Sequence, residues 1–180
     1  MWPRSRCDAE AGSTDALDLA HSGGLIPLLA VPYFICPRCA WRGNRLSTTE
    51  GFSDRPVGCA NCGFGFLFEL MDDYFPSPLA GIFVCDQQGR ILAFGLGADT
   101  VSGFDEDELL GVPITEALEL RADGEAADHV ATAIEWGVRV MGKPMTLRHA
   151  EGEVRPVTGD FFPALDDDGG LLAVFTPRPI

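Results

Sequence analysis

Basic residues are scarce in this sequence, and their scarcity limits what the protein can bind. The 180 residues include 13 Lys and Arg against 27 Asp and Glu, which gives a formal net charge of −14. Residues 76–180 alone carry seven basic and 18 acidic groups, a net charge of −11. A surface this acidic repels phosphate backbones. The charge therefore argues against a nucleic-acid partner.

The sequence also lacks a long apolar stretch. The longest apolar run near the N-terminus, residues 25–35, contains two prolines and is too short to cross a bilayer. Residues 1–6 are not followed by the apolar segment of a secretory leader. We therefore expect no membrane association and a cytoplasmic protein, in which thiols stay reduced.

Little in the sequence points to catalysis. Histidine occurs at three positions, His21, His129 and His149, and none of them stands in a recognisable catalytic motif. The segment at residues 95–97, Gly-Leu-Gly, lacks the third glycine and the lysine of phosphate-binding loops. We therefore expect that the protein is not an enzyme.

Cysteine, by contrast, occurs in a specific pattern. Cys36 and Cys39 form one Cys-x-x-Cys motif, and Cys59 and Cys62 form a second after 19 intervening residues. Two such motifs can place four thiolates around one ion, and zinc favours four tetrahedral ligands of this kind. Because cysteine fills all four positions, we expect a structural Zn²⁺ rather than a catalytic one. Two disulfides, a thiol redox pair and an iron site are the alternatives.

The spacing of the two motifs resembles that of a zinc ribbon, in which two cysteine turns on two β-hairpins close on one ion. The resemblance covers roughly residues 31–70. Gly63, directly after the second motif, suits the open backbone of such a turn, whereas Ala40 follows the first motif. Trp41 and Phe52 are expected to form the small core, with the metal as its main support.

Composition divides the chain into four parts. Residues 1–24 are polar, and we expect residues 1–30 to form a flexible or loosely docked N-terminal arm. Residues 31–72 form the ribbon unit, which ends in a predicted strand over 64–70 with phenylalanines on one face. The acidic and proline-rich residues 73–78 predict a linker, and residues 79–180 form a separate domain.

The patterns over the last part follow a definite order. Two strands joined by a turn come first, then two short helices, one longer helix and three strands. The expected ranges are 79–85 and 90–94 for the first strands, 104–111 and a segment from Pro113 for the short helices, 125–140 for the long helix, and 144–149, 154–162 and 171–175 for the last strands.

This order of elements resembles a PAS domain over roughly residues 79–177. The local matches are the strand–turn–strand at 82–94, the Gly-Phe … Glu-Leu-Leu-Gly-Val segment at 103–112, and the closing hairpin. The resemblance implies an α+β fold in which a five-stranded antiparallel sheet carries helices on one face and encloses a pocket. It also implies sensing, dimerisation or partner binding, and no catalysis.

The pocket that this resemblance implies has candidate lining residues, but its ligand is unknown. His129 on the long helix is a candidate haem ligand, and a surface or boundary position on that helix is the alternative. The reactive cysteine of flavin-binding relatives has no counterpart, because no cysteine follows Cys85. A small apolar ligand and an ordinary filled core both remain open. The candidate residues are Phe94, Val101, Phe104, His129, Val130, Ile134, Trp136 and Leu147, with Leu92 and Ile114 nearby.

Together, these observations predict a non-enzymatic regulatory or signalling protein. A structural zinc ribbon would be joined to a PAS-like sensory or interaction domain that acts through a protein partner, and a homodimer is compatible with that arrangement. A haem or small-ligand sensor is the first alternative. A transcription-associated zinc-ribbon factor that uses Arg38, Arg42 and Arg45 is the second.

Overall fold

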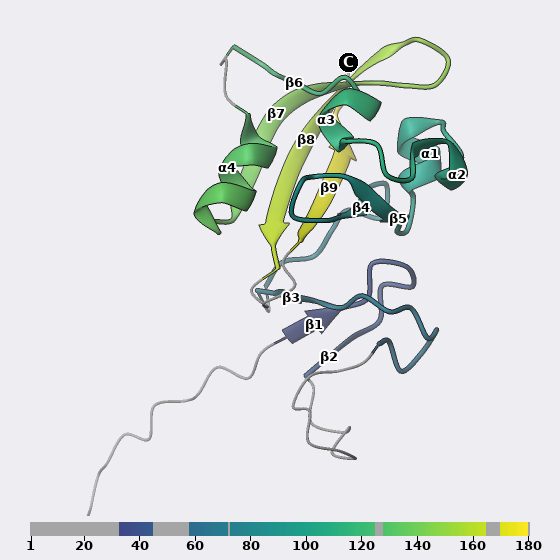
Figure 1. Cartoon of the computed structure of the whole chain (residues 1–180), viewed down its shortest axis with the longest axis vertical. Helices are drawn as coiled ribbons and strands as arrows, with labels where there is room; N and C mark the ends of the chain where they lie inside the picture. The colour runs from purple at the N-terminus through teal and green to yellow at the C-terminus, as the bar shows by residue number, and fades with distance from the viewer. Residues whose placement is uncertain (1–32, 45–57, 72, 125–127, 165–169, 180) are drawn as a thin grey trace, which may run out of the picture. The chain divides into compact units, whose positions relative to one another are not determined.

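The structure is a computed structural model (Figure 1), and it describes residues 33–44, 58–71, 73–124, 128–164 and 170–179. All of these residues fall within one compact unit, Val31–Ile180. The predicted N-terminal arm and Phe52 lie outside the described residues.

The N-terminal part is a small antiparallel sheet. It consists of β1 (Tyr33–Ile35), β2 (Arg42–Asn44) and β3 (Phe68–Leu70), in the order β2-β1-β3. The strand predicted over residues 64–70 is therefore shorter than expected. The first residue of the predicted strand, Phe64, takes part in a turn instead, where its carbonyl accepts a hydrogen bond from the Cys59 amide at 2.8 Å.

The second sheet has six strands, all antiparallel, in the order β5-β4-β9-β8-β7-β6. The five predicted strands are all present, and β6 is an addition of two residues that pairs with Thr146 and Met145. So short a strand leaves no alternating pattern in the sequence. The bounds are β4 Gly81–Cys85, β5 Ile91–Phe94, β6 Arg121–Ala122, β7 Val140–Arg148, β8 Val154–Pro163 and β9 Leu171–Pro177.

The helices are α1 (Ala98–Ser102), α2 (Glu106–Leu109), α3 (Ile114–Ala117) and α4 (His129–Trp136). Sequence patterns miss α1, because five residues between two glycines show no helical period. The acidic start of α2 is confirmed as a capping box between Asp105 and Glu108.

The long helix predicted over 125–140 is wrong in its extent, since α4 has eight described residues. The Asp128 side chain accepts a hydrogen bond from the Ala131 amide at 2.9 Å and so caps the N-terminus. Gly137 ends the helix with a left-handed backbone, φ 60°. The following residues join β7, which therefore begins earlier than the predicted strand at 144–149.

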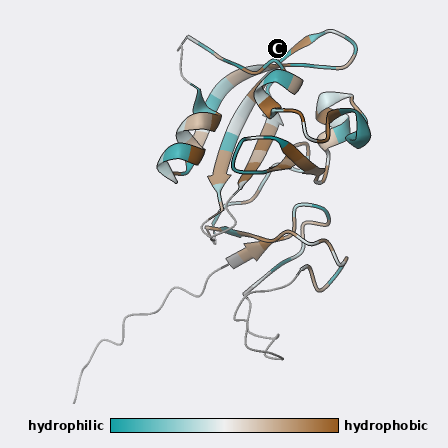
Figure 2. Ribbon diagram, in the orientation of Figure 1, coloured by the Kyte–Doolittle hydropathy of each residue, from teal (hydrophilic) through white to brown (hydrophobic). Residues whose placement is uncertain are grey.

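Both faces of the six-stranded sheet are covered by apolar side chains. Along β4, Phe83 and Cys85 belong to a buried cluster that contains residues of all four helices. Ile82 and Val84, which alternate with them, belong to a second buried cluster. The central strand β9 is buried from Leu171 to Phe175 and is coloured hydrophobic in Figure 2. The fold prediction, an antiparallel sheet with helices on one face, is confirmed.

The second cluster, which we call the outer cluster, includes side chains of the small N-terminal sheet. Ile35 of β1, with Phe68 and Leu70 of β3, joins the outer face of the large sheet. Tyr74, in the segment predicted as a linker, also packs there, with its ring 4.6 Å from that of Phe162. The large-sheet residues of this cluster are Ile82, Val84, Ala93, Phe162, Leu172 and Val174.

Candidate metal centre

The four cysteines of the paired motifs come together in space. Their Sγ atoms all lie within 4.8 Å of one another. The Sγ atoms of Cys36 and Cys62 are 3.6 Å apart, as are those of Cys39 and Cys59. A disulfide needs about 2.0 Å between sulfurs. Tetrahedral ligands about 2.3 Å from an ion lie roughly 3.8 Å apart. The four sulfurs could therefore bind one metal ion.

Two equivalent turns present these sulfurs. In the first, the Ala40 amide donates to the carbonyl of Cys36 at 2.9 Å, and in the second the Gly63 amide donates to the carbonyl of Cys59 at 2.9 Å. Both residues have a left-handed backbone, with φ 56° at Ala40 and 73° at Gly63. The expected need for an open backbone at Gly63 is thus met, and Ala40 adopts the same conformation despite its Cβ.

Hydrogen-bond donors surround the sulfurs. The backbone amide of Asn61 donates to Cys59 Sγ and its side-chain Nδ2 donates to Cys39 Sγ, each at 3.4 Å. Burial raises the pKa of the Cys39 thiol, but hydrogen bonds from Asn61, from the Trp41 amide and with the neighbouring sulfurs outweigh it and lower the pKa to about 6. Burial raises the pKa of Cys36 to about 12. A bound cation favours the thiolate form of all four groups, so the donor set fits a metal.

The first cysteine turn is attached to the PAS-like part of the chain by polar contacts. The carbonyl of Pro37 accepts a hydrogen bond from the Leu96 amide at 2.8 Å. The guanidinium of Arg38 lies 3.4 Å from a carboxylate oxygen of Glu106 and 4.7 Å from the centre of the Phe64 ring.

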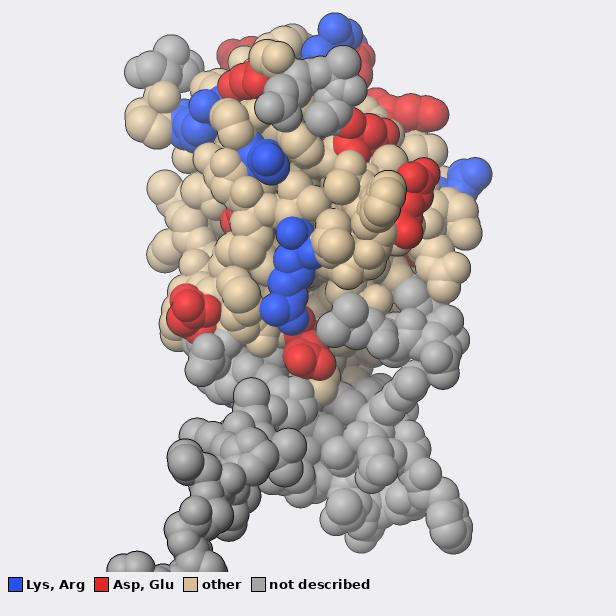
Figure 3. Space-filling view, turned by 90° about the vertical axis from the view of Figure 1, so that its left-hand side faces the viewer, with Lys and Arg blue, Asp and Glu red and all other residues tan. Residues whose placement is uncertain are grey.

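The arginines considered for nucleic-acid binding contact the protein itself. Arg38 pairs with Glu106. Arg42 donates to the carbonyl of Tyr74, and its guanidinium lies 3.9 Å from the centre of the Phe75 ring. Arg45 lies outside the described residues. On the face shown in Figure 3, basic and acidic side chains are interspersed rather than gathered into one basic patch.

Most of the predicted pocket residues gather in the buried cluster that contains Phe83, Cys85 and residues of the helices, which we call the inner cluster. Phe94, Val101, Val130 and Leu147 are buried there, and Phe104 and Ile134 pack against them half-buried. Two of the candidates face solvent instead, since Leu92 is 43% exposed and Trp136 is 76% exposed. His129 is buried at 7% exposure, more than a boundary position predicts. A ligand in this region remains a prediction.

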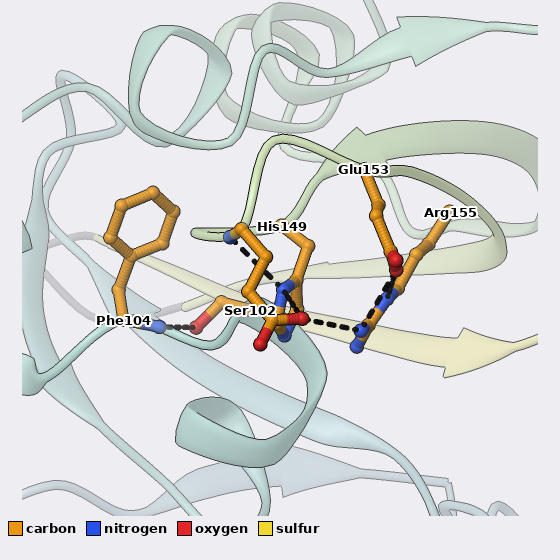
Figure 4. A network of polar contacts seen from close by, with 6 residues as sticks. Ser102, Phe104, His149, Glu153 and Arg155 are labelled. Carbon is orange, nitrogen blue, oxygen red and sulfur yellow. Dashed lines mark hydrogen bonds and ion pairs between the residues drawn. The ribbon is translucent and has the colours of Figure 1, made fainter.

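A polar network around His149 was not foreseen from sequence (Figure 4). His149 Nδ1 accepts a hydrogen bond from the Glu151 amide at 3.3 Å and lies 3.6 Å from the Glu151 carboxylate. The Glu151 carboxylate in turn lies 3.8 Å from Arg155. The imidazole ring packs against Gly103, where a Cβ would collide with it. These polar contacts lie within the β7–β8 hairpin, and the packing of the His149 ring on Gly103 joins the hairpin to the end of α1. The glycine at 103 was the sequence signal for this packing.

The described residues include no helix of the length and apolar character that a membrane span requires.

Comparison with known proteins identifies the second part of the chain. A family model described as the PAS fold matches residues 77–176. Among solved structures, a PAS domain from Colwellia psychrerythraea is 21% identical, with a TM-score of 0.46, over 56% of this chain and 86% of that one. The PAS domain of nitrogen regulation protein NR(II) from Vibrio parahaemolyticus is 9% identical, with a TM-score of 0.45, over 56% and 90%.

A third similar structure is the LOV domain of a blue-light-activated histidine kinase from Erythrobacter litoralis. It is 14% identical, with a TM-score of 0.44, over 56% of this chain and 96% of that one. None of the curated proteins matches this chain.

Proposed function

This chain belongs to the PAS-fold family, and on that premise we propose that it is a non-enzymatic regulatory protein with a structural zinc ribbon. The ribbon comprises about residues 31–72, and the PAS domain that follows senses a signal or binds a partner. The observation that supports the proposal most strongly is the convergence of four cysteine sulfurs within 4.8 Å.

Zinc is the metal that we assign to this centre. Four thiolates in two Cys-x-x-Cys turns are the usual donor set of structural zinc, and a fourth cysteine leaves no open coordination position for catalysis. The sulfur–sulfur distances of 3.6 Å are too long for disulfide bonds. Iron accepts the same donors, so the experiment below also identifies the element.

The size of the ribbon supports a structural role for the metal. Among the described residues its three strands have three residues each, and so small a sheet needs a further cross-link besides its apolar contacts. The ion would hold the two cysteine turns together. The Asn61 donors would stabilise the thiolates, and the turns would present Ile35 and Phe68 to the large sheet.

The output of the protein would pass through a partner protein. The PAS domain implies a sensory or signalling role, and no catalytic motif accompanies it in this sequence. The mass measured by native mass spectrometry would distinguish a homodimer from a transcription-associated complex. A second candidate function, a small-ligand sensor, is supported by the predicted pocket residues that gather in the inner cluster.

Native mass spectrometry of the full chain, purified without added metal, tests the proposal. We expect one zinc per chain, and loss of the zinc in Cys62→Ser but not in Cys7→Ser, which changes a cysteine outside the two motifs. An additional stoichiometric small molecule would favour the ligand sensor. A metal-free chain, or one in which Cys62→Ser binds zinc as the unchanged protein does, would contradict the structural zinc ribbon.

A further inference from the structure

We propose that the metal centre regulates the PAS domain by coupling to the segment that contains α1 and α2. This inference rests on the proposed function, since it requires a ribbon that binds metal. Pro37 and Arg38 are the two residues between the cysteines of the first turn. Both of them contact the PAS domain, and so does Ile35, directly before the turn.

Three contacts, or routes, couple the first cysteine turn to the PAS domain, and the first route is a backbone contact. The Pro37 carbonyl accepts the Leu96 amide at 2.8 Å. A Cβ added at Gly95 would lie 2.7 Å from the same carbonyl oxygen, so the cysteine turn sits directly against the chain that leaves β5. Because the contact is between backbones, a rearrangement of the turn on metal loss must move or release the Leu96 amide.

The second route passes through one carboxylate. Glu106 places one oxygen 3.4 Å from Arg38 and accepts the Phe94 amide on its other oxygen at 3.0 Å. β5 is the edge strand of the large sheet, and the carboxylate satisfies this amide of the strand. The ion pair is half-exposed, so it contributes less than the other routes.

The third route is apolar. Ile35 immediately precedes Cys36 and is 2% exposed within the outer cluster of the large sheet. A metal that fixes Cys36 therefore also fixes Ile35 on the sheet. Burial of a large aliphatic side chain stabilises more than an exposed ion pair, so this contact anchors the first cysteine turn on the sheet, and the other two routes reach α1 and α2 from there.

The segment reached by the first two routes forms part of the core. Leu96 precedes α1 and Glu106 begins α2, and between them Val101 and Phe104 contact the inner cluster. Metal loading would thus favour one arrangement of a wall of the predicted pocket. Because coupling is reciprocal, whatever holds α1 and α2 in that arrangement would also raise the metal affinity.

Amide hydrogen exchange, measured by NMR on the full chain with and without Zn²⁺, tests this coupling. The amides of Ala40 and Gly63 report on the two cysteine turns, and those of Leu96 and Phe94 report on the coupled segment. We expect zinc to slow exchange at Leu96 and Phe94 about ten-fold. The amide of His149, bonded within the β7–β8 turn at 2.8 Å, is the reference and should change less than about two-fold.

One variant separates the second route from the first. Arg38→Gln removes the ion pair and leaves the cysteines and the Pro37 carbonyl, so the zinc response of Phe94 should fall while that of Leu96 is kept. The matched control is Arg148→Gln, which removes the exposed ion pair with Glu119 and should leave both responses unchanged.

This experiment distinguishes a failure of the inference from a failure of the proposed function. If zinc slows Ala40 and Gly63 but leaves Leu96 and Phe94 at their metal-free rates, the metal binds without coupling and the inference is overturned alone. If zinc does not bind and none of these amides responds, the proposed function fails and the inference fails with it.

Discussion

Ala40 and Gly63 occupy equivalent positions in the two cysteine turns, and both have a left-handed backbone. Their φ angles are 56° and 73°, and each amide donates to the carbonyl of the cysteine four residues earlier. A residue with a Cβ is disfavoured in this conformation, whereas glycine is not. The first turn is therefore strained in a way that the second is not.

This difference predicts that Ala40→Gly stabilises the zinc-loaded protein by about 0.5–1 kcal/mol, since the gain from relieved strain exceeds the extra chain entropy of glycine. Gly63→Ala should destabilise it by about 1 kcal/mol. Urea unfolding in saturating zinc measures both free energies. A destabilising Ala40→Gly would contradict the left-handed turn.

Removal of the metal should weaken the PAS domain as well as the ribbon. Without the ion, Ile35, Phe68 and Leu70 lose the turns that hold them on the outer cluster, and each such side chain contributes about 1.5–3 kcal/mol when fully buried. We expect chelation to leave the inner cluster folded, to lower the urea midpoint of the PAS domain, and to increase binding of an apolar dye.

The control for chelation is the protein with zinc restored, which should regain the original midpoint. An unchanged midpoint and unchanged dye binding on metal removal would show that the outer cluster does not depend on the ion.

Tyr74 should make stability depend on alkaline pH. Its hydroxyl donates to the Asp160 carboxylate at 2.8 Å, and burial, followed by the charge and hydrogen bond of Asp160, raises the pKa of Tyr74 well above its ordinary value. The protonated phenol is thus favoured in the folded state. Its stabilisation is fully present below pH about 10, the unfolded value, and is lost as the pH rises above it.

Tyr74→Phe removes this hydrogen bond and should cost about 1 kcal/mol at neutral pH. The difference in unfolding free energy between the two proteins should shrink above pH about 10. Asp160 keeps its bond from the Gly142 amide, at 2.6 Å, in either protein. A difference that stays constant from neutral to alkaline pH would rule out this role for Tyr74.

Gly103 and His149 should be energetically coupled. Gly103 ends α1 with φ 76°, and a Cβ there would collide with the His149 ring. Gly103→Ala should therefore cost more than the roughly 1–2 kcal/mol of backbone strain alone. In a His149→Ala background only the strain should remain, and a double-mutant cycle by thermal unfolding measures the difference. Additive effects would mean that ring and glycine do not meet.

Local sequence signals predicted the parts of this protein in which chemistry follows from spacing. The two cysteine motifs converge as their spacing predicted, because a Cys-x-x-Cys turn fixes its own backbone and four sulfurs at these spacings can meet at one point. The order of strands and the acidic cap of α2 could likewise be predicted from the sequence, since each depends on residues close in the chain.

Other features depend on residues far apart in the sequence and left no such signal. Ile35 and Val174, which are 139 residues apart in the sequence, belong to one buried cluster. The pairing of Arg38 with Glu106 spans 68 residues. The length of α4 was misjudged for a local reason, since the apolar pattern continues past Gly137 into the strand β7.

The most direct test of the metal centre is X-ray absorption at the zinc edge on the full chain, purified without added metal. We predict zinc with four sulfur neighbours at about 2.3 Å. An iron edge in place of zinc, or zinc with nitrogen and oxygen neighbours in place of four sulfurs, would contradict the assignment of Cys36, Cys39, Cys59 and Cys62 as a structural zinc site.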